Sequence, residues 1–110
     1  MKGRKLVRQY NSGERDFSRV RLRRAKLEGA NLQDIDLSWS YLGEANLRDA
    51  DLAGANLMGC DLVEADLQDA NLEEANLHGA NLYKANVTDV QLEQADSLTG
   101  AILPEGGRHE

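Results

Sequence analysis

Leucine recurs at every fifth position over most of the chain, and this spacing fits neither a straight helix nor a straight strand. The column starts at Phe17 and Leu22, runs in fives to Leu82, and continues as Val87 and Leu92. In an α-helix, side chains five residues apart point about 140° away from each other around the axis. In a strand they point to opposite faces. The pattern therefore predicts a backbone that bends once in every five residues.

Each pentad has a second apolar position, two residues before the leucine. It is usually Ala, and the exceptions within the regular part are Val20, Ile35, Ser40, Cys60 and Val90. Asn or Asp usually comes just before the leucine, and polar residues or Gly follow it. The Ala-x-Leu alternation is typical of a short strand, while Asn, Asp and Gly favour turns. A chain that bends the same way in every pentad winds into a coil with Leu and Ala inside.

Residues twenty apart share properties, which favours a coil of four sides. Four right-angle corners close in twenty residues and place such residues about 4.8 Å apart, the spacing of paired strands. Val20, Ser40 and Cys60 are spaced in this way. Opposite charges meet at the same spacing in three pairs: Arg24 with Glu44, Glu64 with Lys84, and Glu28 with Arg48.

The segment ANLRDADLAGANLMGCDLVEADLQDANLEEANLHGANLYKAN resembles the pentapeptide-repeat family, whose pattern is Ala-(Asp/Asn)-Leu-X-X. The resemblance covers residues 15–104 and departs from the pattern at Arg21, Lys26 and Ser97. It implies an all-β fold, a right-handed quadrilateral parallel β-helix of about 4–4.5 coils. Many members of this family have no assigned activity, and they abound in photosynthetic bacteria.

The two ends of the coil are expected to differ. Residues 1–14 are predicted to form a short capping helix and a turn, residues 15–104 the β-helix, and residues 105–110 a flexible tail. The leucine that follows Leu92 comes six residues later, so Ser97 is interpreted as a one-residue bulge. Pro104 lacks an N–H and is expected to stop the coil. The C-terminal end is therefore predicted to be open, with Leu98, Ile102 and Leu103 as a candidate surface for self-association.

The charges are distributed unevenly along the chain. Its net charge is −6, yet residues 1–30 carry +7 and residues 31–110 carry −13. A basic head suggests an acidic partner, whereas an acidic body opposes general binding to nucleic acid. The start, MKGRKLVRQY, has no apolar stretch behind it, and no run reaches membrane-spanning length. With one cysteine only, the composition favours a reducing, cytoplasmic compartment, and the family resemblance implies a bacterial protein.

The search for catalytic chemistry points away from an enzyme. Cys60 occupies an inward position and is interpreted as a core residue, the alternative being a reactive thiol. His78 has no neighbouring His or Cys with which to bind a metal. An acidic column of Asp49, Asp69 and Asp89 is interpreted as a solvated face, with cation binding as the alternative. We therefore predict no catalytic residues, no metal and no cofactor.

Outward positions with unusual residues give a candidate partner-binding patch. Its members are Trp39, Tyr41, Val63, Tyr83, Arg19, Arg21 and Arg23. Aromatic side chains beside arginines are typical of protein-binding hot spots. The alternative is that they are exposed apolar residues with no function, which are common on protein surfaces. Trp39 could also be structural, stacked on Arg19 as a cation–π pair.

Three functions remain open from the sequence. The first is a non-catalytic scaffold or protein-interaction module. The second is an acidic mimic of DNA, because the chain is similar to the pentapeptide-repeat proteins that inhibit gyrase. The short rod, the basic first coil and the lack of an apolar C-terminal helix oppose this alternative. The third, direct binding of nucleic acid by the basic head, is opposed by the acidic body.

Overall fold

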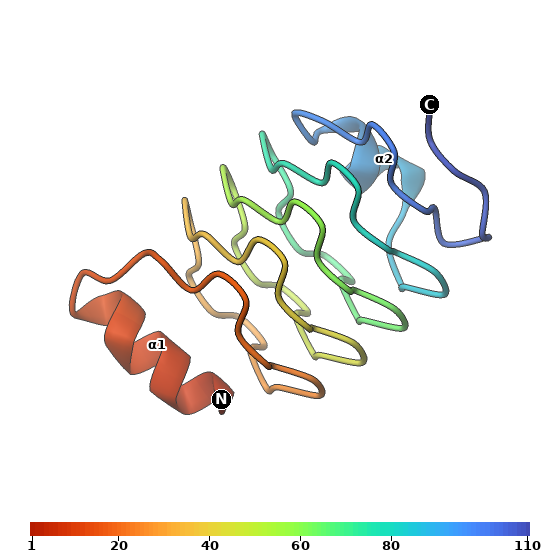
Figure 1. Ribbon diagram of the computed structural model, residues 1–110. Coiled ribbons are helices and arrows are strands. Elements are labelled where there is room, and N and C mark those ends of the chain that lie inside the picture. Colours follow the sequence, from red (N-terminus) through yellow and green to blue (C-terminus); the bar gives the residue numbers. More distant parts are fainter.

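The computed structural model describes all residues, 1–110, and shows a rod of stacked coils (Figure 1). The rod measures 37 × 23 × 23 Å. Helix α1, Gly3–Asn11, lies at the N-terminal end and helix α2, Asp89–Glu93, near the C-terminal end. Between them the coils pair through single-residue parallel bridges, because a turn interrupts each strand after every pentad. Eleven bridges, from Asp16–Asp36 to Asp66–Asn86, join residues twenty apart, so four pentads make one coil.

The same hydrogen-bonded turn closes each pentad from Leu22 to Leu82. The amide of the small residue donates to the carbonyl of the preceding leucine, as from Ala45 to Leu42 over 3.0 Å. The second residue after the leucine has a positive φ at all fourteen positions from Arg19 to Lys84. Ten of these fourteen residues are not Gly, and their φ angles lie between 57° and 61°. The bend therefore relies on a conformation that costs L-residues roughly 1–2 kcal/mol each.

Leucines fill the interior of the coil. Those from Leu22 to Leu82 are at most 1% exposed, and they belong to one cluster of 28 buried residues. The small column between them leaves room for this packing, and its polar member Ser40 is satisfied internally. Its hydroxyl accepts from the amide of Val20 and donates to the carbonyl of Phe17, both at 3.0 Å. The hydroxyl of Ser40 thus links Phe17 to Val20 across the turn of the preceding coil.

Helix α1 covers the first coil. Leu6 and Tyr10 are buried, and Gly3 lies so close to the carbonyl of Lys26 that a Cβ would collide with it. The hydroxyl of Tyr10 donates to the carbonyl of Gln33 over 2.7 Å. The apolar face of the helix is thereby used for packing. Its basic residues Arg4, Lys5 and Arg8, and Lys2 just before it, remain exposed.

The extra residue of the last coil lies in α2, which corrects the interpretation of Ser97 as a bulge. Ser97 itself pairs with Asn76, and Ile102 with Asn81, both at a spacing of twenty-one. Pairing at a spacing of twenty ends at Asn86, so the helix absorbs the insertion. A capping box between Thr88 and Gln91 starts α2. The side-chain amide of Gln91 also donates to the carbonyls of Leu67 and Ala70.

The last residues differ from the flexible tail that we expected. The chain turns back after Pro104, and Arg108 forms an antiparallel bridge with Ile102. Backbone hydrogen bonds of 2.7–2.8 Å run from Leu103 to Gly107, from Gly100 to His109, and from His109 to Ala101. The outer edge of the strand around Ile102 is therefore paired within the chain. This pairing removes the physical reason for expecting an open end there.

The leucine column yields a direct test of the core. Leu62→Ala removes a fully buried side chain and should lower the free energy of unfolding by roughly 2–5 kcal/mol. Gln68→Ala, at an exposed position of the next pentad, should change it by less than about 0.5 kcal/mol. Urea titration followed by circular dichroism measures both. Equal losses from the two substitutions would contradict the assignment of inward and outward positions.

The returning C-terminal segment yields a second test. Deleting residues 105–110 unpairs the backbone of residues 100–103 and should promote self-association, because an unpaired strand edge recruits another chain. Sedimentation velocity at increasing concentration measures this effect. Arg108→Gln, which keeps the backbone pairing, is the control and should behave like the parent chain. A truncated chain that stays monomeric would show that this edge needs no cover.

Candidate partner-binding site

One side of the coil carries most of the candidate patch. We call it the Tyr41 side, and its inward residues are Leu22, Leu42, Leu62 and Leu82. The outward residues that flank these leucines are Arg21 and Arg23, Tyr41 and Gly43, Asp61 and Val63, and Asn81 and Tyr83. Bridges hold Arg21, Tyr41, Asp61 and Asn81 in one column, since each pairs with the next. The coil thus brings together side chains that lie twenty residues apart in the sequence.

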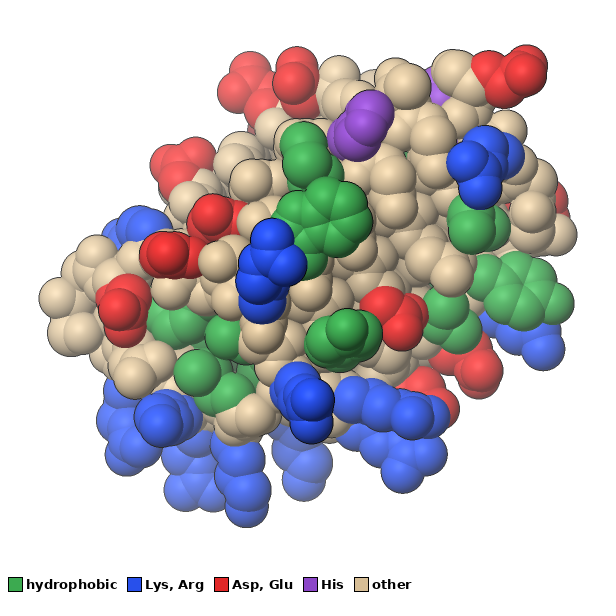
Figure 2. Space-filling model, viewed as in Figure 1, with side chains coloured by type: hydrophobic (Ala, Val, Ile, Leu, Met, Phe, Trp, Pro, Cys, Tyr) green, Lys and Arg blue, Asp and Glu red, His purple; other side chains and the backbone are tan.

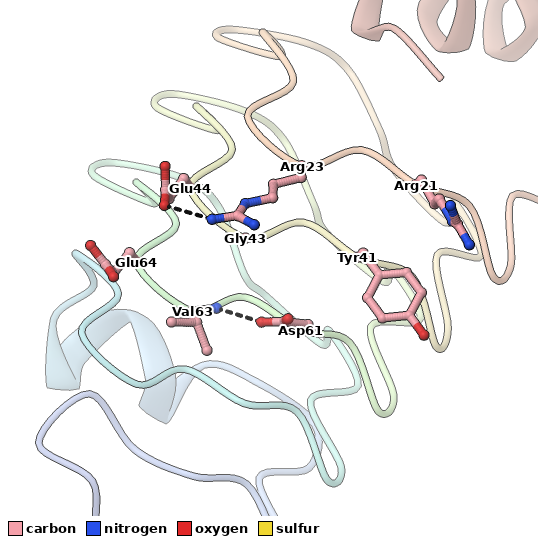
Figure 3. Close-up of a pocket in the computed structure, with 8 residues that line it drawn as sticks. All are labelled: Arg21, Arg23, Tyr41, Gly43, Glu44, Asp61, Val63 and Glu64. Carbon is pink, nitrogen blue, oxygen red and sulfur yellow. Dashed lines mark hydrogen bonds and ion pairs between the residues drawn. The ribbon is translucent and has the colours of Figure 1, made fainter.

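Two adjoining depressions lie around Tyr41, and together we call them the Tyr41 groove. The first has a volume of ≈ 530 Å³ and is shown in Figure 3. Its lining residues are Arg21, Arg23, Tyr41, Gly43, Glu44, Asp61, Val63 and Glu64. The second, of ≈ 360 Å³, is lined by Arg19, Arg21, Trp39, Ser40, Tyr41, Gly59 and Asp61. Three residues line both: Arg21, Tyr41 and Asp61.

Gly43 creates the floor of the first depression. It is buried, and it stands where other pentads carry an outward side chain. A Cβ placed there would find its nearest neighbour, the carbonyl oxygen of Val63, at 3.6 Å. A Cβ would therefore fit at this position, and packing does not require Gly there. The missing side chain leaves room between Tyr41 and Glu44, which lie towards opposite ends of the depression (Figure 3).

Trp39 and Tyr41 are both about half exposed, at 51% and 54%, but only Trp39 is held against the backbone. The indole of Trp39 lies on Gly59, where a Cβ would collide with the ring. No cation–π contact joins Trp39 to Arg19, so that alternative is wrong: the two such contacts pair Arg15 with Tyr10 and Lys84 with Tyr83. Trp39 forms a fixed wall of the groove, while Tyr41 projects outward (Figure 3).

Tyr83 and the C-terminal candidates lie outside the groove. The ring of Tyr83 is 5.3 Å from Lys84 Nζ and lies against Gly106 of the returning C-terminal segment. Leu98, Ile102 and Leu103 are partly buried. Of the sequence-predicted patch, the groove therefore collects Arg19, Arg21, Arg23, Trp39, Tyr41 and Val63.

The ion pairs of the groove leave two arginines free. Glu44 accepts from Arg24 over 2.7 Å and from Arg23 over 3.2 Å. The hydrogen bond from Arg24, followed by that from Arg23, lowers the pKa of the Glu44 carboxyl. The third ion pair of the structure joins Arg48 to Asp66, so Arg19 and Arg21 have no acidic partner. Of the charge pairs predicted at a spacing of twenty, only Arg24–Glu44 forms an ion pair.

Basic side chains gather around the N-terminal part of the molecule, and apolar side chains are exposed next to them (Figure 2). Arg4, Lys5 and Arg8 of α1, together with Lys2 just before it, line a cationic depression of their own. The Tyr41 groove lies one coil further on, with Arg19, Arg21 and Arg23 on its N-terminal side. Positive charge is thus present on both surfaces, and in the groove it stands beside Glu44, Asp61 and Glu64.

Other reactive groups show no arrangement for catalysis. The thiol of Cys60 is buried and donates to the carbonyl of Leu37 over 2.8 Å, and burial raises its pKa to about 12. No three His, Cys, Asp or Glu side chains are grouped so that they could hold a metal ion. Asp49 and Asp69 are exposed, while Asp89 begins α2.

Sequence reasoning found the aromatic and basic members of the groove but missed Gly43. The available signal was a double departure from the repeat within one pentad. Tyr41 stands in place of Asn or Asp, and Gly43 follows the leucine directly, where no positive φ calls for Gly. Together these two residues mark the place where the regular surface is interrupted.

A comparison with protein families decides what kind of coil this is. The profile described as pentapeptide repeats matches residues 16–38, 30–69 and 60–96, with eight copies in the chain. The chain belongs to the pentapeptide-repeat family. Membership implies the right-handed β-helix of this family. Neither α1 nor α2 has the length and apolar composition that a bilayer-spanning helix requires.

Solved pentapeptide-repeat structures resemble this protein to different degrees. One, from the thylakoid lumen of Arabidopsis thaliana, is 30% identical, with a TM-score of 0.73 over 87% of this chain and 66% of its own. Another, from Nostoc PCC 7120, is 39% identical over 93% and 75% of the two chains, with a TM-score of 0.40. QnrB1, a plasmid-mediated fluoroquinolone resistance protein, is 21% identical over 77% and 37%, with a TM-score of 0.46. A search of curated proteins found no match.

The burial of Cys60 yields a third test. A pKa of about 12 against an ordinary value of 9.0 leaves the folded protein with about a thousandfold less thiolate at pH 8. A disulfide reagent such as Ellman's should therefore react slowly with native protein and rapidly after unfolding in urea. Absorbance at pH 8 measures both rates. Fast reaction in the native state would mean that the coil opens at this turn.

Proposed function

We propose that this pentapeptide-repeat protein is a non-catalytic interaction module that binds another protein through the Tyr41 groove. Two half-exposed aromatic side chains beside two unpaired arginines are the observation that carries the proposal. Aromatic residues and Arg contribute more binding energy at interfaces than other residue types. A cytoplasmic location is part of the proposal, on the composition and the single buried cysteine.

The rod itself supports a binding role over a catalytic one. Its side chains either fill a closed Leu and Ala core or line an outer surface whose ladder fixes their spacing. Such a surface changes little on binding, so little conformational free energy is lost when a partner binds to it. The groove offers shape and charge, and it holds no nucleophile next to a base.

The second candidate function is a DNA mimic that binds a DNA-processing protein such as gyrase. The charge of −13 on residues 31–110 favours it, because a mimic must present negative charge along the rod. The arginines of the first coil and the basic face of α1 interrupt that negative surface. A gyrase supercoiling assay separates the two functions. Inhibition at a stoichiometric concentration of protein would favour the mimic over the interaction module.

The groove can be tested by quantitative affinity capture from lysate of the native host. Tyr41→Ala removes an exposed ring from the groove and should weaken retention of the partner by at least about 2 kcal/mol, or thirtyfold. Tyr83→Ala removes an exposed ring outside it and is the matched control. The melting temperatures of both variants should stay close to that of the parent. Equal loss of the partner from both variants would contradict binding at the groove.

A further inference from the structure

The Asn or Asp before each leucine has a definite role in this coil. Its side-chain oxygen accepts a hydrogen bond from the amide of the residue that follows the leucine. Eleven pentads contain this bond, among them Asp61 to the amide of Val63 over 3.0 Å and Asn81 to that of Tyr83 over 3.1 Å. The bond satisfies an amide that the ladder between coils leaves unused. It explains why Asn and Asp recur at this position.

Three pentads lack the bond, because Arg21, Lys26 and Tyr41 occupy the position of Asn or Asp. In these three pentads the amide that follows the leucine therefore has no acceptor within the chain, and these amides belong to Arg23, Glu28 and Gly43. Arg23 and Glu28 are exposed residues of the first coil, whereas Gly43 is buried at the floor of the Tyr41 groove. Buried amides are almost always paired, so an unpaired one calls for an acceptor.

Among the charged groups around Gly43, which have both signs, Arg21 favours a negatively charged acceptor. Among the acids, Asp61 is bound by the amide of Val63 and Glu44 by two arginines. Glu64 has no ion pair, but it lies at the end of the depression far from Arg21 (Figure 3). Arg21 stands one coil before Tyr41 in the same column and has no acidic partner. Arg21 therefore brings a positive charge without an ion pair to one side of Tyr41, while Asp61, whose bond to an amide leaves its negative charge in place, lies on the other side.

We propose that the amide of Gly43 and the guanidinium of Arg21 bind a carboxylate side chain from an acidic segment of the partner protein. The carboxylate oxygen takes the place that the Asn or Asp oxygen holds in other pentads. Apolar side chains next to the carboxylate in the partner pack against Tyr41 and Val63. Hydrogen bonds between a backbone amide and a carboxylate are stronger than neutral ones, and Arg adds charge. This inference rests on the proposed function and names the chemistry that its groove recognises.

The probe is a short peptide, acetyl-Leu-Asp-Leu-amide, and its counterpart with Asn instead of Asp is the neutral control. Binding is followed by ¹H–¹⁵N NMR of the full chain at constant ionic strength. The Asp peptide should move the Gly43 amide proton downfield and should bind about tenfold more tightly than the Asn peptide. Arg21→Gln, which keeps the length and loses the charge, should remove most of that difference. Equal binding of the two peptides would overturn the assignment of a carboxylate.

Two substitutions at one position separate the amide from the ring. Tyr41→Asn supplies the missing oxygen within the chain, so the Gly43 amide should become bonded internally, exchange more slowly with solvent and lose the Asp peptide. Tyr41→Ala removes the same ring without supplying an acceptor, so the peptide-induced shift of the Gly43 amide should remain. If both variants lose the shift equally, the ring and not the amide holds the peptide, and the proposal fails.

The same variants distinguish this failure from failure of the proposed function. Should Tyr41→Ala lose the native partner while neither peptide shifts Gly43, the groove binds its partner without a carboxylate contact. Unchanged retention of the partner by Tyr41→Ala would instead overturn the proposed function itself. Slower exchange of Gly43 in Tyr41→Asn, without peptide, would show independently that this amide lacks an acceptor in the parent chain.

Discussion

The rod depends on the turn that closes the pentads from Leu22 to Leu82, in which the amide of the small residue donates to the carbonyl of the leucine before it. The turn holds its third residue at positive φ, even where that residue is Arg, Trp or Glu. Each such residue is strained, and the conformation persists because its surroundings determine it. A leucine is buried on one side of every turn and the ladder to the next coil fixes the other. The five-residue period is thus a compromise between local strain and shared burial.

The oxygen of Asn or Asp follows from this geometry, because the turn leaves one amide per pentad outside the ladder. A side chain of the right length, two residues earlier, bonds that amide and leaves a flat polar surface. Where the side chain is Tyr41, the surface loses its acceptor and gains an exposed ring. Because Gly43 follows the same leucine, the floor of the groove is open as well. One pentad with two departures therefore provides the rim and the floor of the groove.

Much of this arrangement can be predicted from the sequence, because the same five-residue pattern recurs along most of the chain. The leucine column predicts the core, and the spacing of twenty places Arg21, Tyr41 and Val63 on one side. The C-terminal closure is harder to predict, since residues 104–110 have no period and pair only by returning onto the strand around Ile102. The position of the insertion was readable, because Thr88 and Gln91 have the spacing of a capping box. Gly43 was missed because its contribution is an absent side chain.

The groove lies between a basic and an acidic part of the molecule. An acidic segment of the proposed partner would be repelled along the body of residues 31–110 and attracted towards the first coil and α1. Arg19 and Arg21 stand at the boundary between these regions, on the N-terminal side of the Gly43 amide, which lacks an acceptor within the chain. Long-range attraction would therefore lead such a segment to the place where a hydrogen bond is available. At 0.1 M, salt screens the attraction between charges that lie more than about 10 Å apart, but it does not weaken the short contact at Gly43. The two contributions therefore act at different distances.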